Sequence, residues 1–179
     1  MRKWIARRLI DRFGARYDYD VGYMRHLLEV SPSAFFKFIS AAKLSSHGEA
    51  APKGALAAAR IVGAMTEDCG PCVQIFVDMA REAGIDDNEI DAVLRRDVSA
   101  MNRETAIGYI FADRLARREN ADAVREEARA EWGDKAVIDL TFALQGARLY
   151  PMTKAGLGFA SECARVKVGD NLVAVVKAA

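Results

Sequence analysis

Two of the three cysteines, Cys69 and Cys72, are spaced Cys-x-x-Cys. Thr66 or Asp68 can cap a helix that starts here, and the apolar run 75–77 continues it. The helix N-terminus carries a partial positive charge that favours a thiolate over a thiol. A cysteine in solution has a pKa of about 8.5, and a pair of this kind can reach about 7. The spacing therefore predicts thiol redox chemistry at Cys69 and Cys72.

Two other uses of the pair compete with redox chemistry. A structural zinc site needs four ligands. The third cysteine, Cys163, and the histidines His26 and His47 stand apart in the sequence, so they would complete such a site only by coincidence. The pair could also be two inert, buried apolar side chains. We favour redox chemistry, with no metal and no bound cofactor.

Composition restricts the class of protein. The chain has 179 residues, 51% of them hydrophobic, and a net charge of +1, which suits one globular domain and argues against a nucleic-acid partner. No apolar run approaches the roughly 20 residues of a membrane helix, so we expect no membrane insertion. The N-terminal residues lack the apolar segment of a secretory signal, which predicts a cytoplasmic location.

Helical periodicity dominates the chain, and only its end alternates as strands do. We expect an all-α helical bundle with a short C-terminal β-hairpin. The predicted helices are 2–13, 20–28, 32 onward, 53–65, 69–83, 86–96, 102–118, 122–132, 134–150 and a further one from Pro151 to about 163; the predicted strands are 166–168 and 172–176.

The helix 69–83 is expected to lie at the centre of the fold. Its apolar positions recur at helical spacing from Cys72 through Ile75, Phe76 and Met79. Cys72 should therefore face the core, and Cys69, at the helix start, should be the more accessible thiol.

One further start signal and two surfaces follow from local sequence. Asp86 followed by Glu89 predicts a capping box for the helix 86–96. Gln74 and Asp78 lie off the apolar stripe and are expected at a surface or interface. The first helix, 2–13, has an apolar side and a strongly basic side, which is either solvated or a partner surface.

A longer block carries a family resemblance. The segments 69–72, 80–90, 109–113 and 132–140 look like those of the alkylhydroperoxidase D-like, or carboxymuconolactone decarboxylase-like, family. The resemblance implies an all-helical fold assembled as a homo-oligomer. We therefore read 1–179 as a single domain with an N-terminal helical extension (1–50), a family core (52–164) and a tail (165–179).

The resemblance also implies a mechanism. In the thiol-active members the second cysteine attacks a peroxide and the first resolves the sulfenic acid to a disulfide. An external dithiol then regenerates the pair. By position, Cys72 would be the peroxidatic residue and Cys69 the resolving one.

The chain departs from that family at its proton relay. Phe76 stands where the family has a histidine, and Ala57 stands where it has a glutamate. Glu67 is the nearest local substitute as proton acceptor, with His26 and His47 as more distant candidates. Two alternatives therefore stay open: disulfide exchange without peroxide, and a non-catalytic helical interaction protein.

Overall fold

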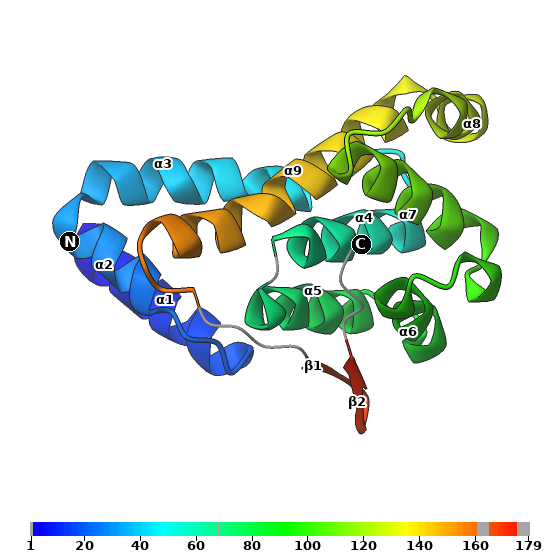
Figure 1. Ribbon diagram of the computed structural model, residues 1–179. Coiled ribbons are helices and arrows are strands. Elements are labelled where there is room, and N and C mark those ends of the chain that lie inside the picture. Colours follow the sequence, from blue (N-terminus) through cyan, green and yellow to red (C-terminus); the bar gives the residue numbers. More distant parts are fainter. Residues whose placement is uncertain (1, 68, 161–164, 175–179) are drawn as a thin grey trace.

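The computed structural model describes residues 2–67, 69–160 and 165–174. These segments form a helical bundle with one small antiparallel sheet near the C-terminal end, so the expected all-α fold with a short hairpin is confirmed (Figure 1). None of the helices in these segments is both long and apolar enough to cross a membrane.

The N-terminal helices form one side of the bundle. They are α1 (Arg2–Arg16), α2 (Gly22–Val30) and α3 (Pro32–Ala42), followed by the 3-10 turn η1 (Lys43–Ser46). Ser31 caps α3 by accepting a hydrogen bond from the Ala34 N–H at 3.3 Å. Helix α1 runs three residues beyond its expected end, through Gly14, before the chain turns toward α2.

Helix α4 (Lys53–Thr66) occupies the centre of the fold. It packs most extensively against α7 (Arg103–Ala116) and α9 (Asp134–Gly156), and also against α5 (Gly70–Glu82) (Figure 1). Small residues allow these close approaches. A Cβ on Gly108 of α7, for example, would lie 2.4 Å from the Ala55 carbonyl oxygen of α4.

Local start signals explain several helix boundaries. Helix α6 (Asp87–Arg95) is capped by Asp86, and α7 is capped by Asn102, which accepts from the Thr105 N–H at 3.0 Å. The expected capping box at α6 is wrong in one respect. The Glu89 carboxylate accepts from the Asn102 N–H at 3.0 Å instead, because the chain folds back after the short turn η2 (Val98–Ala100) and presents that donor.

The C-terminal part has a proline inside a helix. Helix α8 (Asp122–Trp132) ends as expected, and α9 follows it. The sequence predicts that Pro151 kinks or ends its helix; the helix does not end there, because α9 continues to Gly156. A proline removes only one helical hydrogen bond, and the buried apolar stripe of α9 holds the turns on either side. Cys163 lies outside the described residues.

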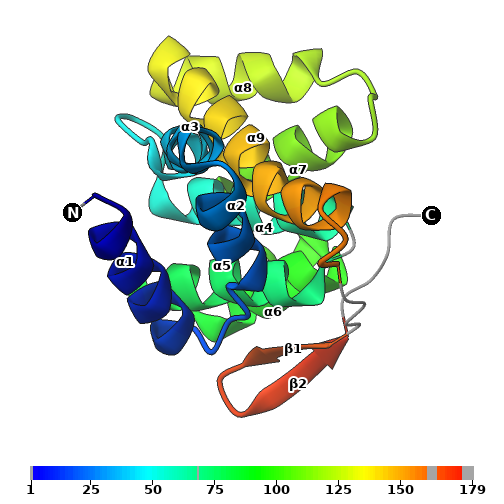
Figure 2. The same cartoon turned by 90° about the vertical axis from the view of Figure 1, so that its left-hand side faces the viewer.

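The hairpin consists of β1 (Arg165–Val168) and β2 (Asn171–Ala174), with Val166 opposite Val173. It lies against α5 and α6 (Figure 2). Gln74 of α5 holds β1 through both main-chain groups of Lys167: its Nε2 donates to the carbonyl oxygen at 2.9 Å, and its Oε1 accepts from the N–H at 2.6 Å. Gln74 is therefore an internal interface residue.

Candidate functional site: a buried dithiol

The cysteine pair lies at the start of α5. Cys69 is the N-cap residue, and its carbonyl oxygen accepts from the N–H groups of Cys72 and Val73, both at 3.0 Å. Pro71 occupies the first turn, where a missing N–H leaves no helical bond unmade. Thr66 does not cap this helix: its hydroxyl donates to the Val62 carbonyl oxygen within α4. Asp68 lies outside the described residues.

The two sulfur atoms are in direct contact. Cys69 Sγ donates to Cys72 Sγ at 2.6 Å, whereas a disulfide bond measures about 2.05 Å. Closing the pair to a disulfide therefore needs only a small movement. Cys69 is 5% exposed and Cys72 is fully buried, so their order of accessibility is as expected, but neither is open to a bulky reactant.

Tyr19 reaches the pair from the segment between α1 and α2. Its hydroxyl lies 3.4 Å from Cys72 Sγ, and the residue is itself buried. Tyr23 packs edge-on against the Tyr19 ring, with the centroids 6.3 Å apart. The aromatic residues of the N-terminal segment thus form one wall of the thiol site.

A buried lysine from α9 completes the arrangement. Lys154 is 1% exposed, and its Nζ lies 4.8 Å from the centroid of the Tyr19 ring and 5.7 Å from that of Tyr23. Both distances suit cation–π contacts. Among the residues the structure describes, no carboxylate pairs with this ammonium group. A lysine buried in this way is rare, and here its charge lies beside the thiols.

The groups around Cys72 shift its pKa in opposite directions. The contact with Cys69 and burial both raise the pKa of Cys72, while the Tyr19 hydrogen bond and the Lys154 charge lower it; the net direction is upward. Two thiolates at this separation would repel each other strongly. The expected lowering toward 7 is therefore wrong for Cys72. Burial also raises the pKa of Tyr19, so its hydroxyl stays protonated, and either this hydroxyl or the Cys72 thiol can donate in their contact.

The three proton acceptors expected from sequence are engaged elsewhere. The Glu67 Oε1 atom binds Arg148 of α9, with Nη2 at 2.6 Å and Nε at 2.7 Å. His47 lies 3.3 Å from the buried carboxylate of Asp139. His26 packs against the Phe159 ring. Of the side chains that the structure describes, Cys69 and Tyr19 contact the Cys72 sulfur by hydrogen bonding.

Phe76 and Ala57, at the relay positions of the resembled family, lie close in space. Both line a cavity of about 210 Å³ between α4 and α5. Phe76 packs against the Tyr150 ring at a centroid distance of 6.1 Å. The fold thus brings these positions together, and both are apolar.

Sequence reasoning missed Tyr19 and Lys154. For Lys154 a signal exists, because it continues the apolar stripe of α9 through Leu140, Leu144, Ala147 and Pro151 at helical spacing. A lysine on such a stripe is buried by its neighbours. For Tyr19 we find no local signal beyond the aromatic content of the segment.

Comparison of the chain with protein-family models, with curated proteins and with solved structures finds no match.

Proposed function

We propose that the protein is a thiol oxidoreductase whose Cys69–Cys72 pair cycles between dithiol and disulfide while reducing a peroxide. The observation that carries the proposal is the 2.6 Å contact of the two sulfurs inside a buried site that also holds a hydroxyl donor and a cation. If the cysteine pair served only packing, a buried lysine such as Lys154 next to it would have no function. The resemblance of the motif segments to the alkylhydroperoxidase D-like family supports peroxide as the oxidant.

The chemistry runs in two steps. The Cys72 thiol first releases its proton. The thiolate then attacks the terminal OH oxygen of a hydroperoxide, the O–O bond breaks, and the leaving alkoxide takes up one proton to give an alcohol. Cys72 is then a sulfenic acid. The Cys69 thiol attacks that sulfur, forming the disulfide and releasing water. An external dithiol restores both thiols and is itself oxidised to its disulfide.

The neighbouring side chains have separate roles in this scheme. Once Cys72 is a thiolate, the Tyr19 hydroxyl is the donor in their contact, and the Lys154 charge stabilises the thiolate. Because both cysteines are buried, a small oxidant reaches them more readily than a protein disulfide does, which favours peroxide reduction over disulfide exchange. The need for an external dithiol fits the cytoplasmic location expected from sequence.

A thiol titration tests the proposal. In a Cys163→Ser background, an equivalent of hydrogen peroxide should remove both thiols of the pair, measured after acid quenching and unfolding. Cys72→Ser should consume no peroxide, and Cys69→Ser should leave a sulfenic acid that dimedone traps. Because the pKa of Cys72 is raised, peroxide consumption should accelerate as the pH rises above neutral.

Retention of both thiols after peroxide treatment would rule the proposal out. If the dithiol form reduces insulin while peroxide is not consumed, the protein is a disulfide-exchange protein. Homo-oligomerisation, which the resemblance also implies, is checked separately by sedimentation velocity.

A further inference from the structure

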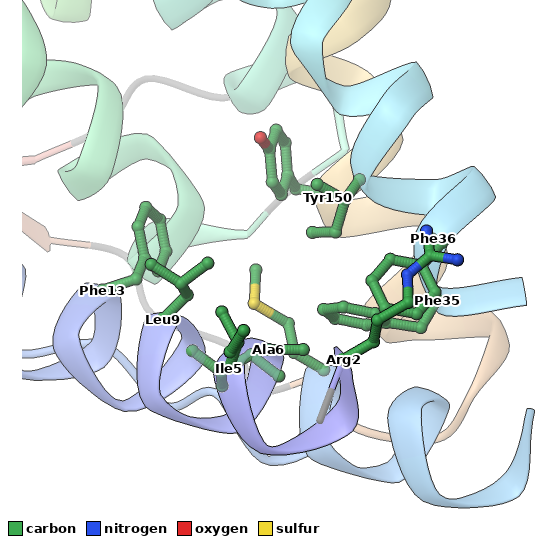
Figure 3. Close-up of a pocket in the computed structure, with 11 residues that line it drawn as sticks. Arg2, Ile5, Ala6, Leu9, Phe13, Phe35, Phe36 and Tyr150 are labelled. Carbon is green, nitrogen blue, oxygen red and sulfur yellow. The ribbon is translucent and has the colours of Figure 1, made fainter. Parts of the chain in front are cut away.

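A solvent-open groove lies between α1 and α3, and its lining includes Phe13 and Tyr150. Its volume is about 390 Å³, within the range of small-molecule sites. Its lining includes the buried residues Met24 and Phe35, and Tyr150 of α9 lies across from α1 (Figure 3). Among the described residues of the lining, only Tyr150 and Arg2 carry a polar group in their side chains.

The rim of the groove leaves large apolar side chains in contact with water. Ile5 is 47% exposed and Leu9 is 59% exposed, and both face the groove from α1. Apolar side chains gathered at a concave site, rather than scattered singly, mark a place where an apolar ligand gains by burial.

Arg2 supplies the one formal charge among the described residues that line the groove. Its guanidinium carbon lies 5.1 Å from the centroid of the Phe36 ring, and Figure 3 shows Arg2 beside Phe35 and Phe36 at one end, with Phe13 at the other. The described side chains include no carboxylate partner for this guanidinium. The groove therefore has an apolar channel and a cation at one end.

We propose that this groove binds an aliphatic carboxylate, with the chain lying between α1 and α3 and the carboxylate paired with Arg2. The complementarity is of two kinds: a hydrocarbon chain buries apolar lining, and a guanidinium pairs with a carboxylate through two parallel hydrogen bonds. A groove between two helices fits a single chain better than it fits a flat bilayer surface. The proposal does not depend on the redox chemistry of the cysteine pair.

Calorimetric titration of the full chain with sodium laurate, kept below its micelle concentration, tests the proposal. Laurate should bind saturably at one site. Arg2→Glu should weaken that binding about tenfold or more, because a charge-assisted pair is replaced by repulsion. Lys3→Glu is the matched control, since it makes the same change of charge at the neighbouring residue, outside the groove lining, and should leave affinity nearly unchanged.

Two further measurements separate the head group from the chain. Dodecanol, which lacks the carboxylate, should bind equally well to the wild type and to Arg2→Glu. Leu9→Glu, at an exposed rim position that folding tolerates, should weaken both ligands. Absence of saturable laurate binding would overturn the proposal, as would equal loss in Arg2→Glu and Lys3→Glu. If the chain binds no laurate but sediments with anionic phospholipid vesicles, the proposal is wrong and α1 is a membrane-surface helix. If the chain binds no laurate but self-associates, and Leu9→Glu abolishes the self-association, the proposal is wrong and the groove is a contact between copies.

Discussion

Cys72 and Lys154 show how single residues set the chemistry of this site. Tyr19 and Lys154 favour a thiolate at Cys72, while burial and the second thiol oppose it; the helix start is a third favourable group on general grounds. Each favourable group comes from a different part of the chain. Loss of any one of these groups should therefore raise the pKa of Cys72 further while leaving the contact between the two sulfurs in place.

Lys154→Met should raise the pKa of Cys72 further. The substitution keeps the length and apolar stem of the side chain but removes the positive charge, so we expect an upward shift of about one unit, or about tenfold slower alkylation near neutral pH. The measurement is the pH profile of iodoacetamide modification in a Cys163→Ser background.

The control for Lys154→Met is Lys135→Met, which removes a surface charge paired with Glu49. Its alkylation profile should match that of the wild type. An unchanged profile in Lys154→Met would show that the lysine serves packing and not the thiol.

At the scale of elements, Asp139 joins α9 to the loop before α4. Its Oδ2 accepts hydrogen bonds from the N–H groups of Glu49, Ala50 and Ala51, at 2.9, 2.7 and 2.9 Å. Burial alone would raise the pKa of Asp139, but these donors and His47 outweigh it and lower the pKa.

Asp139→Asn should destabilise the fold by about 2 kcal/mol at neutral pH, because three N–H groups lose a charged acceptor. A carboxyl whose folded pKa is lowered stabilises the fold above its unfolded pKa of about 3.9, and this contribution is lost as the pH falls through the folded pKa. Urea unfolding should thus show a deficit at neutral pH that shrinks in acid. Asp134→Asn, at an exposed position of the same helix, should show little deficit at either pH.

The crossing of α4 and α7 depends on Gly108. An added methyl group would lie 2.4 Å from the Ala55 carbonyl oxygen and 2.5 Å from Ala55 Cα, and a main chain cannot yield as a side chain does. Gly108→Ala should therefore cost about 1–3 kcal/mol of unfolding free energy.

Gly156→Ala is the matched substitution for Gly108→Ala. It also lies in a helix, but nothing stands within 4 Å of the added carbon. Thermal unfolding should show a stability equal to or slightly above that of the wild type. Equal stability of the two variants would mean that α4 and α7 are packed less closely than described.

Local features of the elements were predictable from sequence, and features that join distant elements were not. Ser31, Asp86 and Asn102 act within one turn of their own helices, so their caps could be predicted. Glu89 instead accepts a hydrogen bond from Asn102, a later residue whose position depends on the fold. Pro151 is tolerated inside α9 because neighbouring helices cover that helix. The cysteine pair could be predicted as a site because its two residues are only three positions apart in the sequence. Tyr19 and Lys154 become part of the site only through tertiary packing. That packing also joins the segment expected as an N-terminal extension to the rest of the fold.

At the scale of the whole molecule, burial should make the cysteine pair selective by reagent size. In a Cys163→Ser background, methyl methanethiosulfonate should modify the native chain, whereas the bulkier dithionitrobenzoate should react slowly until the fold opens locally. Sub-denaturing urea should accelerate the reaction with dithionitrobenzoate more than the reaction with methyl methanethiosulfonate. The unfolded chain, in which both reagents meet exposed thiols, is the reference. Dithionitrobenzoate reacting as fast with the native chain as with the unfolded one would contradict the burial described.

The placement of Tyr19, the cysteine pair and Lys154 has a consequence for biosynthesis. A ribosome releases Tyr19 first, the cysteines next, and Lys154 last of these residues. Until α9 has folded onto the earlier helices, the thiols have no cation beside them. A growing chain therefore carries two ordinary thiols, and the special environment of Cys72 arises late, when the enclosure that restricts its access is also formed.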